Sequence, residues 1–336
     1  MRLEYVREEL QSLTLLARRN SYNSRMATPS LHWMTYPPAA LTGGAVTVGN
    51  FDGVHLGHQA LVAGAKAWAA RVGGPAVAVT FDPPAAKLLD PASLRLPLST
   101  LADRVEWLTA AGADHVAVLR TDAGLLSLSP EAFFEDVLCG LFRAKAVVEG
   151  YNFRFGRART GDTATLRSLC AAAGVGFDEV PARVVGGEVV SSSRVRAALQ
   201  RGDVAEARVL LGRPYGVAAE VVTGAKRGRT IGFPTANLGT TETLLPGDGV
   251  YAVRATIDGT RYAGAANVGP NPTFGEMARK IEVHLIGFAG DLYGRRLAVE
   301  FVARLRETRP FAGVEALVEQ LNADVASATR ACEELP

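Results

Sequence analysis

The fold of this chain is decided by the stretch Val48-Gly49-Asn50-Phe51-Asp52-Gly53-Val54-His55-Leu56-Gly57-His58. A short apolar run, Ala45 to Val48, leads into it and stops at a glycine. Behind it the apolar residues recur at helical spacing, at Leu61, Ala65 and Trp68. This order predicts a buried strand, a turn and a helix.

The two histidines of this stretch predict a phosphate-binding site. His55 and His58 fall at positions i and i+3 at the start of the predicted helix, so their side chains point the same way. Free backbone N–H groups at a helix start attract phosphate oxygens, and Gly53 and Gly57 have no side chain to keep a nucleotide away. Two imidazoles there are suited to holding the β- and γ-phosphates of ATP while charge builds on departing pyrophosphate. The alternative is that the histidines only cap the helix.

Composition limits the class of protein. A length of 336 residues suits about two domains, and 48% hydrophobic residues are enough for ordinary cores. A net charge of +2, from 36 basic and 34 acidic residues, gives no general signal for binding polyanions, so we expect no nucleic acid partner. Cys139, Cys170 and Cys332 form no metal-ligand or disulfide pattern, which is typical of a reducing cytoplasm.

The start of the chain has no apolar run long enough for a signal peptide or a membrane span. We therefore expect a cytoplasmic protein that does not enter a membrane. Composition leaves the oligomeric state open, and we expect a monomer or a weak homo-oligomer.

The order of predicted strands and helices changes near residue 215. Before it, the strand-like runs Ala76 to Phe81, Val116 to Leu119 and Ala146 to Val148 alternate with helical segments, which predicts right-handed crossovers and a doubly wound parallel sheet, an α/β fold. After it, strands follow one another, with Asp258-Gly259 as a hairpin turn and a helix from about Val314 to Ser327. The second pattern predicts a closed antiparallel β-barrel with a C-terminal helix. The strands expected there are 217–222, 249–257, 261–268, 280–286 and 297–305.

The motif G-x-F-D-x-x-H-x-G-H, from Gly49 to His58, resembles the signature of the nucleotidylyltransferase superfamily. Its longer form resembles one branch, the prokaryotic-type bifunctional riboflavin kinase/FMN adenylyltransferases (FAD synthetases), and the resemblance covers roughly residues 40 to 328. It implies ATP and riboflavin as substrates, FMN as intermediate, FAD as product and Mg²⁺ as cofactor. The domains expected are a partly disordered extension over 1–39, with Met1, Met26 or Met34 as the start, a Rossmann-like FMN adenylyltransferase domain over 40–200, a linker over 201–214 and a riboflavin kinase domain over 215–330.

The resemblance implies an adenylyl-transfer site built from three further segments. Phe81 is expected against the isoalloxazine, although Pro84 and Ala85 depart from the family's His-Pro at this point. Ser192 and Ser193 are expected to donate to phosphate, and Arg196 to neutralise charge at the α-phosphate; a simple helix cap is the alternative. The other binding residues implied are Gly49, Asn50, Phe51, Asp52 and Gly57 of the histidine stretch, and Asn152 and Arg157 of the loop from Gly150 to Asp162.

The segment Gly228-Arg229-Thr230-Ile231-Gly232-Phe233-Pro234-Thr235-Ala236-Asn237-Leu238 resembles the riboflavin kinase motif ending in Pro-Thr-Ala-Asn. Gly228 and Gly232 are expected to let phosphate approach, and the oxygens of Thr235 and Asn237 are hard ligands suited to Mg²⁺. The segments 249–251, with Tyr251 as a ligand-binding residue, 267–274 and 291–294 also match kinase segments.

By resemblance, Glu282 is the general base for the ribityl 5′-hydroxyl. Strand alternation places His284 on the same face, so His284 is the alternative base. Gly287 stands where the family commonly has aspartate.

Three other functions remain to be weighed. Another H-x-G-H adenylyl- or cytidylyltransferase would explain the first domain but leaves Pro234 to Asn237 and Glu282 without a role. The test that discriminates is whether the protein uses FMN as substrate, or nicotinamide mononucleotide or phosphopantetheine. A class I aminoacyl-tRNA synthetase is disfavoured because the chain has no K-M-S-K-S-like segment. A flavin- or nucleotide-binding regulator with a decayed site is disfavoured because the motif residues are retained.

Overall fold

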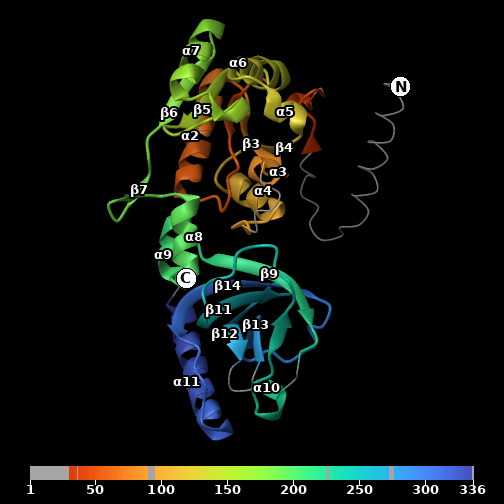
Figure 1. Ribbon diagram of the computed structural model, residues 1–336, viewed down its shortest axis with the longest axis vertical. Helices are drawn as coiled ribbons and strands as arrows, with labels where there is room; N and C mark the ends of the chain where they lie inside the picture. Colours follow the sequence, from red (N-terminus) through yellow and green to blue (C-terminus); the bar gives the residue numbers. More distant parts are fainter. Residues whose placement is uncertain (1–29, 36, 90–94, 225–226, 272–275, 335–336) are drawn as a thin grey trace, which may run out of the picture.

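The computed structural model describes residues 30–35, 37–89, 95–224, 227–271 and 276–334. It contains a parallel-sheet domain and a β-barrel, with the helices α8 (Ser192–Gln200) and α9 (Val204–Leu211) between them (Figure 1). Both predicted architectures are confirmed.

The first domain is a six-stranded parallel sheet in the order β1-β4-β3-β2-β5-β6. Its central strands are apolar and buried because helices cover both faces. Helices α2 and α4 pack on one face, and the π-helical segment η2 and helix α7 on the other. The strands are β1 Ser30–Leu31, β2 Ala45–Val48, β3 Ala76–Asp82, β4 His115–Arg120, β5 Ala146–Gly150 and β6 Gly176–Val180. The helices are η1 Ala39–Leu41, α2 Leu56–Val72, α3 Ala85–Leu89, α4 Leu101–Ala110, α5 Ala123–Ser127, α6 Pro130–Ala132, η2 Phe133–Leu141, η3 Arg157–Arg159 and α7 Thr163–Ala173.

The sheet begins before residue 40. Strand β1 pairs with β4 at Ser30↔Val118 and Leu31↔Leu119, so part of the predicted N-terminal extension is an edge strand. A strand of two residues is too short to show a periodicity, which is why the sequence did not predict it. Residues 1–29 of that extension lie outside the described residues.

The strand order places a topological switch point between β2 and β5. The chain builds β3 and β4 on one side of β2, then crosses to build β5 and β6 on the other. Ligands of open α/β sheets bind beyond the carboxyl ends of the strands at such a point. The loop that follows β2 ends at His55, and His58 lies in the first turn of α2. The loop that follows β5 carries Asn152 and Arg157.

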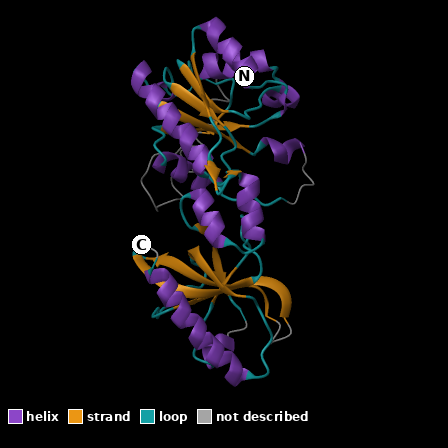
Figure 2. Ribbon diagram, turned by 90° about the vertical axis from the view of Figure 1, so that its left-hand side faces the viewer, coloured by secondary structure: helices purple, strands orange, loops and turns teal. Residues whose placement is uncertain are grey.

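The second domain is a closed antiparallel barrel in the order β10-β13-β12-β11-β14-β9. Asp258 and Gly259 have φ of 50° and 81°, as the predicted two-residue hairpin requires. The short strand β10 was not predicted. The strands are β9 Tyr215–Val222, β10 Ala236–Leu238, β11 Gly249–Ile257, β12 Thr260–Asn271, β13 Glu276–Leu285 and β14 Arg296–Arg306. Helix α10 is Arg227–Thr230, helix α11 (Val314–Glu333) lies along the outside of the barrel (Figure 2), and a small hairpin is formed by β7 Val184–Val185 and β8 Glu188–Val189.

The segment assigned to a linker, residues 201–214, is largely helical, and one face of its helix is buried. Four residues of α9 belong to the same apolar cluster as the barrel interior: Val204, Ala207, Leu210 and Leu211. Helix α9 therefore closes one end of the barrel core, in contact with β9 and β14.

Candidate functional site

His55 and His58 form a stacked pair at the start of α2. His55 is the N-cap, and its Nδ1 accepts from the backbone N–H of His58 at 3.4 Å. The ring centroids are 3.6 Å apart and the ring planes differ by 17°. His55 therefore caps the helix, as the alternative interpretation held, and a neutral ring that accepts at Nδ1 carries its proton on Nε2.

Both imidazoles are neutral at pH 7. Burial lowers the pKa of His55 to about 4, and the positive charge of Arg213 acts in the same direction. Burial and the neighbouring His55 hold the pKa of His58 well below its usual range. Among the described residues, Nδ1 of His58 is buried and has no hydrogen-bond partner. The pair offers ring N–H donors without a resident positive charge.

The loop before the histidines has a strained backbone. Phe51 and Val54 have φ of 46° and 40°, and Gly53 has φ of 81°. Positive φ is rare for residues with a side chain, most of all for a β-branched one, and such strain gathers at functional sites. Phe51 is only 1% exposed, and its ring meets His58 edge-on at 5.2 Å. Phe51, expected among the ligand-binding residues, therefore supports His58 from the core.

Two glycines of this stretch make room for rings. A Cβ at Gly57 would lie 3.1 Å from Cε1 of His55, and one at Gly49 would lie 3.3 Å from the Phe51 ring. These contacts are tight, so a larger residue at either position would push a ring aside. The absence of a side chain at Gly57 therefore leaves room for the His55 ring.

Asp52 joins the loop that leads to His55, residues 49–55 (the histidine loop), to the start of α8. Its carboxylate pairs with Arg196 at 3.0 Å and accepts from the backbone N–H of Leu98 at 2.8 Å. The hydroxyl of Ser192 donates to the backbone carbonyl of Asp52 at 2.9 Å. Two motifs that are about 140 residues apart in the chain thus meet, as their predicted roles require. Ser191 is the N-cap of α8, and Ser193 is exposed beside it.

The loop that follows β5 contributes exposed polar groups. Asn152 and Arg157 are both exposed, whereas Arg154 is paired with Asp162 at 3.2 Å. Just before this loop, Glu149 is 1% exposed and its Oε1 accepts from the N–H of Val48 at 2.7 Å. Burial raises the pKa of Glu149 well above its usual range.

Arg104 is a buried arginine for which the sequence predicted no role. This residue of α4 is 5% exposed, and its Nη1 donates to the carbonyl of Asn50 at 3.1 Å and to Oγ1 of Thr80 at 3.2 Å. The sequence carried one sign of this buried position, because Arg104 lies one helical turn before Leu108, which is buried on the same helix.

Two other predicted site residues lie near this arginine in the structure. Asn50 has an exposed side chain, and Phe81, partly buried at the end of β3, packs against the core. Helix α3 begins at Ala85, where the sequence departs from the family pattern.

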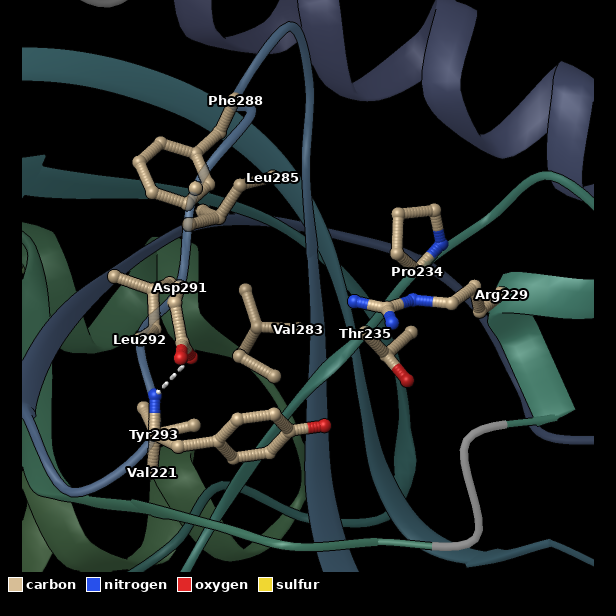
Figure 3. Close-up of a pocket in the computed structure, with 12 residues that line it drawn as sticks. Val221, Arg229, Pro234, Thr235, Val283, Leu285, Phe288, Asp291, Leu292 and Tyr293 are labelled. Atoms are coloured by element: carbon tan, nitrogen blue, oxygen red, sulfur yellow. Dashed lines mark hydrogen bonds between the residues drawn. The ribbon is translucent and has the colours of Figure 1, made fainter.

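The barrel contains a cavity of about 410 Å³ that is partly open to solvent (Figure 3). Thr235 lies on its wall, and the Arg229 side chain extends toward its centre. Asp291 accepts from the backbone N–H of Tyr293 at 2.9 Å, which fixes the turn on the opposite wall. Arg229 and Tyr293 belong to quoted motifs but had been given no role. The cavity is lined by Val221, Arg229, Pro234, Thr235, Ala236, Val283, Leu285, Phe288, Gly290, Asp291, Leu292 and Tyr293.

Asn237 and Glu282 lie directly opposite each other on neighbouring strands. They are Cα partners in the pairing of β10 with β13, and Asn267 of β12 is the next partner of Glu282. The flanking Ile281 and Val283 are buried in the barrel core, so Glu282 faces outward. Directly opposite residues in antiparallel strands have Cβ atoms roughly 5 Å apart. The structure therefore brings the proposed base and one proposed metal ligand together.

His284 is on the same face of β13 as Glu282, as predicted. Its Nδ1 is 2.9 Å from the carbonyl of Pro234, and its ring meets Phe233 at 5.4 Å. These contacts fix the loop that precedes Thr235. His284 is thus already engaged with the Pro-Thr-Ala-Asn segment.

The glycines of this segment shape the loop. A Cβ at Gly228 would lie 2.2 Å from the carbonyl oxygen of Phe233, so only glycine allows this close approach. Gly232 has φ of 87° and open space beside it.

Tyr251, expected to bind ligand, is 0% exposed. Its hydroxyl donates to the carbonyl of Gly247, and its ring meets Phe301 edge-on at 5.3 Å. Strand alternation turns this side chain into the core shared with α9. Tyr251 is therefore a core residue, which corrects the expectation. Of the other matching kinase segment, 267–274, residues 272–274 lie outside the described residues.

The part of the chain that the structure describes has no group of three or more His, Cys, Asp or Glu side chains placed to hold a metal. The hydroxyl of Thr235 and the amide of Asn237 are hard oxygen donors, and they fit an ion that keeps most of its ligands from water and nucleotide phosphates. Cys139, Cys170 and Cys332 are free thiols.

Within the described residues, no helix has the length and apolar character needed to cross a membrane.

Two family models match the chain, one for FAD synthetase over residues 38–194 and one for riboflavin kinase over residues 211–332. The bifunctional riboflavin kinase/FMN adenylyltransferase of Pseudomonas fluorescens is 40% identical, covering 85% of this chain and 92% of that protein. The protein of the same name from Bacillus subtilis is 37% identical, covering 85% of this chain and 91% of that one. A crystal structure titled as a macrolide-efflux protein from Streptococcus pneumoniae aligns with a TM-score of 0.81 and 32% identity, covering 89% of this chain and 98% of that one.

Proposed function

Since the chain belongs to the family of bifunctional riboflavin kinase/FMN adenylyltransferases, we propose a division of its two reactions between the two described domains. The enzyme phosphorylates riboflavin with ATP to give FMN and ADP, then adenylylates FMN with a second ATP to give FAD and pyrophosphate. We assign the second reaction to the switch point of the parallel sheet and the first to the barrel.

In the adenylyl transfer, the phosphate of FMN attacks the α-phosphorus of ATP and pyrophosphate leaves. Nε2–H of His55 and a ring N–H of His58 donate to the departing phosphates. Because His55 is buried, His58 is partly buried and both rings are neutral, they offer donors in a low-dielectric site, where hydrogen bonds to developing charge are strong.

Arg196 neutralises charge at the α-phosphate while Asp52 fixes its guanidinium at 3.0 Å. The exposed Ser193 contacts the phosphates from the start of α8, and the exposed Asn152 and Arg157 contact them from the segment that follows β5. Phe81 lies on the flavin side. Ser192 acts indirectly, since its hydroxyl already bonds to the histidine loop.

In the phosphoryl transfer, Glu282 takes the proton from the ribityl 5′-hydroxyl as that oxygen attacks the γ-phosphorus of ATP. Thr235 and Asn237 would hold Mg²⁺ through their side-chain oxygens, and the ion would supply charge neutralisation at the phosphates. The nucleotide binds in the cavity bordered by Thr235 and Arg229, and its phosphates reach the edge at Pro234, which His284 contacts from the face of β13 that carries Glu282.

The observation that carries the assignment is the junction at Asp52, which connects the histidine loop to Arg196 at the switch point. The direct test is to incubate the purified protein with riboflavin, ATP and Mg²⁺ and to separate the flavins. FMN should appear first and FAD later. FMN adenylylation in the absence of riboflavin, with nicotinamide mononucleotide and phosphopantetheine as competing substrates, separates this function from that of another H-x-G-H transferase.

A further inference from the structure

Arg213 connects the barrel to the histidine loop. It lies between Gly212, which ends α9, and Tyr215, which begins β9. Its Nη2 donates to the carbonyl of Gly53 at 2.8 Å, and its Nη1 donates to the carbonyl of Val54 at 3.2 Å. The guanidinium carbon lies 3.5 Å from the centre of the Trp107 ring in α4. One side chain thus joins the connecting segment, the loop and a helix of the first domain.

The backbone that Arg213 holds is the strained part of the loop. Gly53 and Val54 have φ of 81° and 40° and immediately precede His55. A β-branched residue at positive φ is strained and persists only where its surroundings fix it. Gln59 adds a second restraint, because its amide nitrogen donates to the carbonyls of Val54 at 3.0 Å and of Leu211 at 2.8 Å.

We propose that Arg213 is a positioning residue of the adenylyl-transfer site, holding the carbonyls of Gly53 and Val54 so that His55 and His58 stack at the start of α2. This inference rests on the function proposed above for the histidines. It gives residue 213, in a segment that leads into the kinase barrel, a role in the reaction of the other domain.

The chemistry of the contact requires a guanidinium. Its planar fork donates to two adjacent carbonyls while its face lies on an aromatic ring, and a lysine ammonium cannot do both in the same geometry. Arg213→Lys keeps the positive charge near His55 but loses the fork, whereas Arg213→Ala loses both. Arg208, an arginine of α9 for which no bond to the histidine loop is found among the described residues, is the matched control.

The experiment measures both reactions in the full-length chain with Arg213→Ala, Arg213→Lys, Arg208→Ala and His58→Ala. For Arg213→Ala we expect kcat of FMN adenylylation to fall roughly 10- to 100-fold, since small misplacements of catalytic groups have effects of this size. KM for ATP and FMN should change less than threefold, and riboflavin phosphorylation should stay within twofold of the unmodified enzyme. Arg213→Lys should retain an intermediate kcat, and Arg208→Ala should behave as the unmodified enzyme in both reactions.

The outcomes separate this inference from the proposed function. If His58→Ala still forms FAD at a normal rate, the function proposed for the histidines is wrong. If His58→Ala is inactive but Arg213→Ala keeps its adenylylation kcat within twofold, or changes only KM, the inference about Arg213 alone is overturned. Loss of both reactions in Arg213→Ala and Arg213→Lys would also overturn it, because Arg213 would then support the whole fold.

Discussion

At the scale of single residues, His55 is a helix cap, and this role is compatible with the phosphate-binding role proposed for the histidine pair. His55 caps α2 through Nδ1, which leaves Nε2 to donate outward. In the proposed mechanism one ring is both a helix cap and a phosphate donor, because Nδ1 accepts from the helix and Nε2 remains for the ligand. The cap also fixes the tautomer, so the same contact that begins the helix prepares the donor.

Removing the second ring tests this role. His58→Ala should abolish FAD formation while riboflavin phosphorylation continues, so FMN should accumulate. His55→Ala should have a similar or smaller effect on FAD formation and should also lower the melting temperature, since loss of an N-cap costs about 1 kcal/mol. Flavins separated over a time course, with circular dichroism as the folding control, provide the measurement; simultaneous loss of both reactions in a folded variant would contradict separate sites.

The position of Glu282 opposite Asn237 leads to a second prediction. Glu282→Gln should lower the rate of riboflavin phosphorylation by roughly 10²–10⁴-fold, the range for loss of a positioned general base. Folding and FMN adenylylation should change little because glutamine keeps the size of the side chain.

His284→Ala is the matched variant on the same strand face. We expect it to be less damaging than Glu282→Gln, since His284 is engaged with the carbonyl of Pro234. Initial rates at saturating riboflavin and Mg·ATP compare the two. Near-normal phosphorylation by Glu282→Gln would remove this carboxylate from the mechanism.

At the scale of elements, the switch point of the first domain depends on where the pairing between β2 and β5 ends. Their pairing includes Ala45↔Ala146 and Val46↔Val147. Beyond that point the N–H of Val48 is bonded by the buried carboxyl of Glu149. The Glu149 side chain thus replaces the partner strand as the acceptor for the N–H of Val48. This backbone group stays hydrogen-bonded although the loops that follow β2 and β5 no longer pair.

Glu149 makes stability depend on pH with a definite sign. Burial raises its folded-state pKa well above the ordinary 4.5, so the folded state holds a proton that the unfolded state releases. Its stabilising contribution is complete below pH 4.5 and is lost as pH rises through the folded-state pKa. Glu149→Gln, which is uncharged at every pH, should therefore become progressively more stable than the unmodified enzyme above pH 4.5, by at most about 1.4 kcal/mol per pH unit.

Urea unfolding of both proteins between pH 5 and pH 8 measures this difference. Glu149→Ala is the control for the lost acceptor and should be less stable than Glu149→Gln by roughly 1–3 kcal/mol at every pH, because the N–H of Val48 is left unpaired. A difference between Glu149→Gln and the unmodified enzyme that does not vary with pH would show that Glu149 has an ordinary pKa.

At the scale of the whole molecule, we infer that the kinase unit begins before the first strand of the barrel. The apolar residues of α9 are part of the barrel core, and the N–H of Gly247 donates to the carbonyl of Leu199 in α8. The first domain and the barrel therefore share the α8–α9 pair, which Figure 1 shows between them.

Two fragments test this boundary. A fragment that begins at Ser191 should fold and make FMN but no FAD. A fragment that begins at Leu211 should be less stable by roughly 3–6 kcal/mol, since it loses the buried side chains of Val204 and Leu210. Thermal unfolding and riboflavin phosphorylation of both fragments provide the comparison. Equal melting temperatures would mean that α9 contributes nothing to the barrel.

The sequence by itself determined the two architectures and the order of the motifs. Buried runs alternating with helices predicted the parallel sheet, and successive strands with Asp258-Gly259 predicted the barrel, because periodicity and turn chemistry act within a few residues of chain. Resemblance supplied the candidate residues, and the pairing of Asn237 with Glu282 agrees with the predicted strand faces.

Only the tertiary structure decided which of these residues face a ligand and which support others. Asp52 and Arg196 meet across 144 positions, and Arg213 reaches Gly53 across 160. Phe51 and Tyr251 carry motif positions but are buried, and α9 belongs to the barrel core. Burial and hydrogen-bond partners are set by packing between distant segments, and local patterns carry no information about which distant segment will supply the contact.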